Sequence, residues 1–192
     1  MYLVIDCETT GLPKDRNAPI RDVDNWPRVI QLAWALYDEA QTAIEIASSL
    51  IRPEGFVIPD DVQRIHNIST ERALSEGKDL AETLSALALA AEKAEVLIAH
   101  NLDFDVNVIA AEYLRMGLDP PFGGKKRICT MRQSAEFCGI AGKRGYKWPK
   151  LSQLHQKLFG SDFNEAHDAG ADVAACARCF FALKERGVIS WR

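Results

Sequence analysis

Short apolar segments of two kinds alternate along the chain, and their periodicity distinguishes strands from helices. Residues 2–5 form a continuous apolar run that is typical of a central, buried strand. Residues 29–37 and 43–51 are two further predicted strands, and the polar stretch between them, residues 38–41, predicts a hairpin. Residues 96–99 and 127–130 are the remaining predicted strands.

Apolar residues at helical spacing are most regular over residues 79–95, where the repeating positions are Leu80, Leu84, Leu87 and Ala91. Further helices are predicted over residues 103–116, 130–137, 151–159 and 168–186. Residues 13–27 are polar and contain three prolines, which predicts a surface loop. This order of elements predicts an α/β fold, a mixed sheet covered by helices. No repeat or linker divides the sequence, so we expect a single domain over residues 1–192.

The composition supports a globular protein and limits the kind of partner. The chain has 192 residues, is 47% hydrophobic and 26% charged, and is neither collagen-like nor coiled-coil in character. Its formal net charge of −4 argues against a protein that coats duplex DNA with basic side chains. A local groove for nucleic acid remains compatible with that charge.

The cellular setting is predicted from the chain's apolar runs and cysteines. No run approaches the roughly 18 apolar residues that cross a bilayer, and no basic segment precedes the first strand as in a signal peptide. We therefore expect a cytoplasmic protein without a membrane partner, and free thiols at all five cysteines. Cys176 and Cys179 have the spacing of a redox or zinc pair, but their Ala-rich helical context favours two small core residues.

The first predicted strand leads into two acidic residues. Residues two apart on a strand face the same side, so Asp6 and Glu8 present neighbouring carboxylates while Cys7 points away. An isolated Asp-x-Glu is commonly just a solvated strand end. Here the acids directly follow an apolar strand, where their repulsion is unfavourable unless a cation joins them. Gly11 then allows a sharp turn close to a ligand.

Two further clusters carry acidic residues at predicted helix starts. Asp103 is expected to cap the helix that follows the fourth strand, and Asp105 lies in its first turn. Near the last helix, Asp168 is the expected cap, His167 lies just outside the helix, and Asp172 lies one turn inside it. The small residues 169–171 leave space for a close approach of the sheet or a ligand. Each cluster alone also has an ordinary structural explanation.

Together, the three clusters resemble the motifs of one enzyme family. The order Asp-x-Glu-Thr-Thr-Gly-Leu at residues 6–12, His-Asn-x-x-Phe-Asp at 100–105, and His167 with Asp172 five positions later resembles the DEDDh (DnaQ-like) 3′→5′ exonucleases. That family includes the proofreading exonuclease subunit of bacterial DNA polymerase III. Residues 65–69 also look like the family's His-Gly-Ile-Thr segment, with Asn67 in place of the glycine.

The resemblance implies a ribonuclease H-like fold, a mixed five-stranded sheet flanked by helices. It also implies release of nucleoside 5′-monophosphates from the 3′ end of a single strand by a two-metal mechanism. Two Mg²⁺ or Mn²⁺ ions would be held by Asp6, Glu8, Asp105 and Asp172, with Asp6 shared between them. His167 would be the general base.

The same resemblance assigns Thr9, Leu12, His66 and Asn101 to the substrate. Leu12 would be a wedge against the terminal bases, with ordinary core packing as its alternative. For His66 the alternative is an exposed loop position. His100 and Asn101 can instead orient the junction between strand and helix, and His155 is expected on the surface.

Two stretches of the sequence are basic, residues 123–127 and Gly142–Lys150, and the second can be interpreted in two ways. Lysine, arginine and aromatic side chains on the second stretch can follow a phosphate backbone and stack on bases. The alternative is a solvated loop whose Trp148 packs on the body of the domain.

The sequence also leaves alternatives for the function. DNA is preferred over RNA only weakly, so an exoribonuclease of the same family is the first alternative. A non-catalytic nucleic-acid-binding or polymerase accessory module is the second, although such a module need not keep five reactive side chains. A polymerase partner is not indicated, since the chain ends soon after the last predicted helix, and a free-standing enzyme is expected. The sequence does not indicate an oligomeric state.

Overall fold

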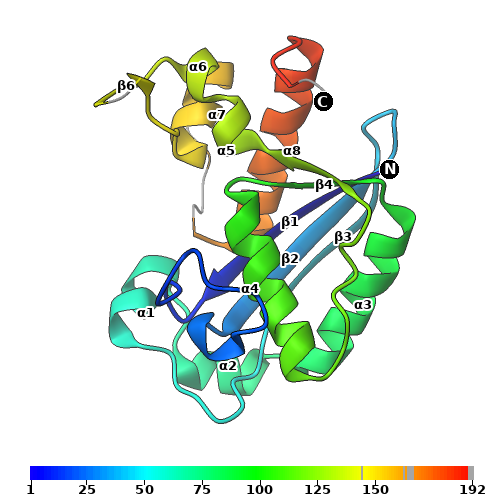
Figure 1. The fold of residues 1–192 in the computed structure, drawn as a ribbon, viewed down its shortest axis with the longest axis vertical. Helices are drawn as coiled ribbons and strands as arrows, with labels where there is room; N and C mark the ends of the chain where they lie inside the picture. The colour runs from blue at the N-terminus through cyan, green and yellow to red at the C-terminus, as the bar shows by residue number, and fades with distance from the viewer. Residues whose placement is uncertain (144, 162, 164–166, 190–192) are drawn as a thin grey trace.

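The computed structural model describes residues 1–143, 145–161, 163 and 167–189 (Figure 1). Its strands are β1 (Tyr2–Thr9), β2 (Val29–Tyr37), β3 (Ala43–Leu50), β4 (Val96–Ala99), β5 (Lys126–Cys129), β6 (Ala141–Gly142) and β7 (Gly145–Tyr146). Its helices are η1 (Val23–Asn25), α1 (Asp60–His66), α2 (Thr70–Glu76), α3 (Leu80–Lys93), α4 (Leu102–Arg115), α5 (Thr130–Gln133), α6 (Ala135–Cys138), α7 (Leu151–Phe159) and α8 (Ala169–Glu185). Among the described residues, no helix is both long and apolar enough to span a bilayer.

The main sheet has five strands in the order β3-β2-β1-β4-β5. β1 pairs with β2 in antiparallel fashion, and β2 pairs with β3 in the same way. β4 is parallel both to β1 and to β5. The predicted mixed five-stranded sheet is therefore confirmed, including the hairpin between its second and third strands.

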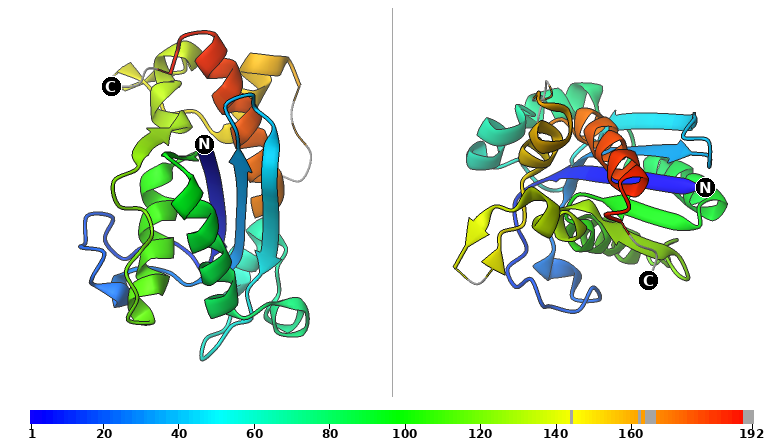
Figure 2. Two further views of the ribbon diagram at one scale, coloured as in Figure 1. Left: turned by 90° about the vertical axis from the view of Figure 1, so that its right-hand side faces the viewer. Right: turned by 90° about the horizontal axis from the view of Figure 1, so that it is seen from above.

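Alternating side chains of the strands pack on both faces of the sheet, with helices on each side (Figures 1 and 2). Leu3, Ile5 and Cys7 of β1 belong to the core that includes residues of α3 and α4. Val4, between them, belongs to a second core with residues of α7 and α8. The sheet is thus the middle layer of three, and Asp6 and Glu8 share a face with Val4.

Several elements differ from the prediction. β1 continues to Thr9, so both acidic residues lie within the strand. The helices α1 and α2 were not predicted because seven residues give too few turns for a clear periodic pattern. η1 lies in the loop predicted over residues 13–27. The helix predicted over residues 130–137 is broken at Ser134 into α5 and α6.

Two residue-level predictions are wrong. α4 begins at Leu102 with Asn101 at its N-cap position, so Asp103 lies inside the helix rather than capping it. His155 is buried, with 1% of its surface exposed, and not on the surface. It lies on the inner side of α7, where its Nδ1 is 2.8 Å from the Ser161 carbonyl oxygen and its ring packs against Phe159.

The cysteines are as predicted. All five are free, and Cys176 and Cys179 are buried on α8 as part of the core. Their side chains fill space between α8 and its neighbours, so the interpretation as core residues is the one that the packing supports.

A buried acid fixes α4 to the sheet. Glu112 is fully buried, and its carboxylate accepts hydrogen bonds from the Arg28 side chain and from the backbone N–H of Val29. Arg115 forms a second ion pair with it at 3.1 Å. These contacts hold the helix whose first turn carries Asp105 against the start of β2.

Candidate active site

The predicted catalytic residues gather where the carboxyl ends of β1 and β4 lie side by side. Because these strands are parallel, both chains leave the sheet at the same edge. α4 follows β4 there, and the start of α8 lies against the same end of β1 (Figure 1). The two helix N-termini provide a local positive field that favours anionic groups.

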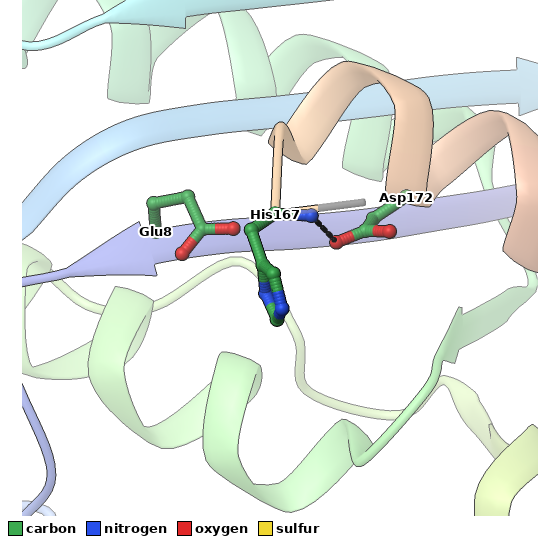
Figure 3. A group of neighbouring side chains, drawn as sticks. All are labelled: Glu8, His167 and Asp172. Carbon is green, nitrogen blue, oxygen red and sulfur yellow. Dashed lines mark hydrogen bonds between the residues drawn. The ribbon is translucent and has the colours of Figure 1, made fainter. Parts of the chain in front are cut away.

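Glu8, His167 and Asp172 form a close cluster. One ligand atom from each lies within 4.8 Å of the others. Figure 3 shows the His167 side chain between the two carboxylates. The backbone N–H of His167 donates to Asp172 Oδ2 at 3.2 Å, and His167 has a positive φ of 73°. This uncommon conformation for a residue with a side chain places the imidazole beside Glu8.

Asp105 approaches the same site from α4. It is buried, and its Oδ1 accepts hydrogen bonds from the Cys7 backbone N–H at 3.2 Å and from Cys7 Sγ at 3.4 Å. Burial and the neighbouring Asp105 raise the pKa of the Cys7 thiol, which keeps it protonated as a donor. The orientation of Asp105 is therefore set by a residue of β1.

The four carboxyl groups influence one another strongly. Burial and the neighbouring carboxylates all raise the pKa of Asp6 well above its ordinary value. Burial is also the main cause that raises the pKa of Glu8 to about 8, of Asp105 to about 7 and of Asp172 to about 6. After burial, the neighbouring carboxylates of Asp105, Asp172 and Glu8 contribute to the raised pKa of Asp6.

This set of side chains fits divalent cations. Buried carboxylates that repel one another are unfavourable when all are ionised, and a cation among them removes the repulsion. Hard oxygen ligands suit Mg²⁺ and Mn²⁺. The donor set thus fits a divalent metal ion.

The start of α8 is fastened to the sheet by polar contacts. Asp168 caps the helix as predicted, and its Oδ1 accepts from the N–H groups of Gly170 and Ala171. Gln31 on β2 donates to Asp168 Oδ2 at 2.8 Å and accepts from the Ala169 N–H at 3.0 Å. A Cβ at Gly170 would lie 3.2 Å from Ser48 Oγ, so the small residue permits the close approach expected there.

The turn after β1 has the geometry expected of Gly11. Its φ of 143° favours glycine, and Thr9 Oγ1 donates to the Gly11 carbonyl oxygen at 2.7 Å. Leu12, beyond this turn, has 70% of its surface exposed. The alternative that Leu12 packs in the core is therefore wrong.

His66 is buried at the end of α1. The alternative in which His66 is an exposed loop residue is therefore wrong. Its Nδ1 accepts from the Ile68 N–H, its Nε2 is buried and has no partner among the described residues, and burial and His167 lower its pKa. His100 links Thr130 Oγ1 and the Pro149 carbonyl oxygen, at 2.9 and 3.0 Å, as expected of a junction residue. Asn101 adopts a left-handed conformation where α4 begins.

Two supporting residues were not predicted. Cys7 and Gln31 act on Asp105 and on the start of α8 through contacts 98 and 137 positions apart in the chain. A polar residue inside the otherwise apolar β2 is the only local sign of Gln31. For Cys7 nothing in the local pattern distinguishes it from a core residue.

One lysine of the first basic stretch, Lys125, has a structural role. Lys125 Nζ donates to the carbonyl oxygens of Ala91 and Ala94, at 2.5 and 2.8 Å, where α3 ends. Its charge therefore complements the negative end of that helix and is not directed toward the carboxylate cluster.

Comparison with known proteins identifies relatives of both sequence and fold. The exonuclease family model (RNase_T) matches residues 3–180. The DNA polymerase III subunit epsilon of Treponema pallidum (strain Nichols) is 28% identical over 182 residues, which cover 95% of this chain and 75% of the relative.

Solved structures of E. coli exonuclease I have the same fold. The complex with a dT13 oligonucleotide superposes with a TM-score of 0.75 at 20% identity, over 96% of this chain and 41% of that one. A zinc-ion-bound complex with single-stranded DNA gives a TM-score of 0.75 at 20% identity, over 96% of this chain and 40% of that one. This chain thus spans less than half the length of exonuclease I. With the match over residues 3–180, the chain belongs to the exonuclease family, in agreement with its predicted class, the DEDDh 3′→5′ exonucleases.

Proposed function

We propose that the protein is a metal-dependent 3′→5′ exonuclease that releases nucleoside 5′-monophosphates from single-stranded nucleic acid. The convergence of Glu8, His167 and Asp172 within 4.8 Å carries this proposal. Asp6 and Asp105 are the other two acids of the proposed site, and the carboxylate of Asp105 contributes to the raised pKa of Asp6. These observations support the proposal that the five side chains expected from the motifs act in one site.

The acids are proposed to hold two Mg²⁺ or Mn²⁺ ions. Asp6, Glu8, Asp105 and Asp172 would hold them. The ions supply charge neutralisation at the scissile phosphate and lower the pKa of the attacking water. The hydrogen bonds from Cys7 keep Asp105 in place for this role.

His167 is proposed as the general base. It lies outside α8 on the exposed side of the carboxylates, and its N–H contact to Asp172 fixes the backbone from which the ring extends. From this exposed position, the His167 imidazole would accept the proton of the attacking water and pass it to solvent.

The 3′-terminal nucleotide is proposed to lie against the turn at Gly11. The exposed Leu12 contacts its base, and Thr9 shapes the turn that receives it. His66 faces the terminal nucleotide, since its Nε2 has no hydrogen-bond partner in the part of the chain that the structure describes. Asn101 contributes from the start of α4.

DNA is the proposed substrate, on the strength of relatives named for a DNA polymerase subunit and for complexes with single-stranded DNA. The test is digestion of matched 5′-labelled DNA and RNA 12-mers with Mg²⁺, Mn²⁺ or EDTA. We expect stepwise shortening, nucleoside 5′-monophosphate products, faster loss of DNA, and none in EDTA. Preferred loss of RNA would instead identify an exoribonuclease.

Two further outcomes separate the remaining alternatives. Tight binding of either 12-mer without release of mononucleotides, in any metal, would identify a non-catalytic binding module. Glu8→Gln is the matched variant: it should abolish shortening and also reduce the rise in melting temperature that Mn²⁺ causes. Co-elution with a DNA polymerase would assign the protein to a polymerase assembly.

A further inference from the structure

A small hairpin projects from the body of the protein, and its exposed surface is rich in aromatic side chains. It comprises β6 and β7 and the described residues on either side, and we call residues 140–143 and 145–150 the basic hairpin (Figures 1 and 2). Tyr146 and Trp148 have 58% and 57% of their surfaces exposed. Trp148 is therefore not buried against the body of the domain, although its ring contacts Arg132 of α5. Large exposed aromatic groups commonly mark binding surfaces.

The charge around the basic hairpin is opposite to that of the whole chain. Residues 137–161 contain no Asp or Glu, although the chain has a net charge of −4. The basic residues of this stretch are Lys143, Arg144, Lys147, Lys150 and Lys157, of which Arg144 lies outside the described residues. Lys143, Lys147 and Lys150 are exposed. A polyanion is the partner whose charge complements this surface.

The base of the basic hairpin is tied to the carboxylate site. His100, at the end of β4, contacts the Pro149 carbonyl oxygen at 3.0 Å. The Arg132 guanidinium lies over the Trp148 ring, 5.2 Å from its centre, and Arg132 also pairs with Asp103 at 2.7 Å. Asp103 shares the first turn of α4 with Asp105. Trp148 is thus connected by two side chains to the helical turn that supplies a carboxylate of the site.

We infer that the basic hairpin binds the nucleotides that precede the 3′ end of a single strand, with bases stacked on Trp148 and Tyr146 and phosphates paired with Lys143 and Lys147. This inference rests on the proposed function for the position of the 3′ end. Aromatic side chains beside cations bind single strands with little regard to sequence, because every base offers a stacking face. The basic hairpin therefore increases the affinity for longer strands, while the carboxylate site carries out hydrolysis.

The test compares substrates of different length. The p-nitrophenyl ester of thymidine 5′-monophosphate reports the chemistry at one nucleotide, and dT12 reports the whole strand. Trp148→Ala should raise the ratio of the KM for dT12 to the KM for the ester by about 10-fold, as expected for loss of a base-stacking contact. Trp148→Phe keeps a ring and should restore most of this ratio.

A second variant tests the charges. The double variant Lys143→Ala/Lys147→Ala should weaken dT12 binding in low salt and reduce the salt dependence of log Kd by about 1.4, from ~0.7 per phosphate contact of a single strand. Lys93→Ala is the matched control, since this exposed lysine ends α3, just before the start of β4. It should leave the salt dependence unchanged. Melting temperatures confirm that each variant is folded.

The outcomes separate the inference from the proposed function. If Trp148→Ala and the double variant leave both the KM ratio and the Kd of dT12 unchanged, the inference is overturned. It is also overturned if the variants impair ester hydrolysis and dT12 digestion equally, because the hairpin would then act on the shape of the site. If the wild-type protein hydrolyses neither substrate but dT12 quenches the fluorescence of Trp148 in EDTA, the proposed function fails and the inference stands.

Discussion

Two hydrogen bonds from one residue of β1 reach a single oxygen of Asp105. The backbone N–H and the thiol of Cys7 both donate to Oδ1, which leaves Oδ2 as the oxygen available to a ligand. The buried thiol keeps its proton, because burial and Asp105 raise its pKa. An otherwise ordinary core cysteine thus orients a carboxylate of the site.

Replacing Cys7 tests this role. Cys7→Ala removes the thiol donor but keeps the backbone N–H, and it should weaken Mn²⁺ binding by about 3-fold, since a net hydrogen bond contributes about 0.5–1.5 kcal/mol. Cys7→Ser retains a donor and should bind Mn²⁺ more tightly than Cys7→Ala. Isothermal titration calorimetry measures both. Equal Mn²⁺ affinity in the alanine and wild-type proteins would show that the backbone contact alone is sufficient.

His167 lies close enough to Glu8 and Asp172 to act either as a base or as a metal ligand. As a base, its replacement in His167→Ala should lower kcat by about 10²- to 10⁴-fold. The same variant should keep the full rise in melting temperature that Mn²⁺ produces in the wild-type protein. Loss of this rise together with activity would mean that the imidazole binds the metal.

At the scale of elements, the start of α8 combines features that the sequence predicts with one that it does not. The cap at Asp168 and the need for small residues at 169–171 follow from local rules, and the structure agrees. The two hydrogen bonds of Gln31 depend on a contact between β2 and α8, which no local sequence pattern predicts. The same limit explains why α1 and α2 were missed, since short helices are stabilised mainly by tertiary packing.

The close approach of α8 to β3 is tested by Gly170→Val. A Cβ at this position would meet Asp168 Oδ1 at 3.1 Å and Ser48 Oγ at 3.2 Å, and a branched side chain needs still more room. We expect a loss of about 1–3 kcal/mol in the free energy of unfolding, as for other overpacked sites. Urea denaturation measures it. Ala174→Val, at an exposed position of the same helix, is the control and should change stability far less. Similar stability of the two variants would contradict a tight contact at Gly170.

At the scale of the whole molecule, the burial of several acids makes stability depend on pH. The folded protein holds protons on Glu8, Asp105 and Asp172 up to a pH of about 8, 7 and 6, respectively. In an unfolded chain the same groups lose their protons near pH 4. The folded state therefore binds more protons across this range, and the free energy of unfolding falls as the pH rises.

We accordingly expect the melting temperature in EDTA to fall between pH 5 and pH 8. Glu8→Gln removes one of the titrating groups and should make this fall shallower. Mn²⁺ should raise the melting temperature more at pH 8 than at pH 5, because protons compete with the cation for the carboxylates. A melting temperature in EDTA that rises with pH would contradict the raised pKa values.

The global architecture was more predictable than its internal connections. Apolar periodicity located all five strands of the main sheet. The resemblance to the exonuclease motifs selected Asp6, Glu8, Asp105, His167 and Asp172 as candidate site residues, and the structure brings Glu8, His167 and Asp172 within 4.8 Å. The burial of His155 and the exposure of Leu12 could not be read from their neighbours, because each depends on which distant element covers the residue. The position of the basic hairpin beside α4 likewise depends on tertiary contacts of His100 and Arg132.

The site takes residues from all three layers: Asp6 and Glu8 from the sheet, Asp105 from the helices on one side, and Asp172 from the helix on the other. Separation of any one layer therefore dismantles the site, so activity requires the complete tertiary structure. As denaturant is added, hydrolysis should disappear together with near-ultraviolet circular dichroism, before or with the loss of helical signal. In a partly folded chain of this kind, secondary structure can persist, but catalysis cannot.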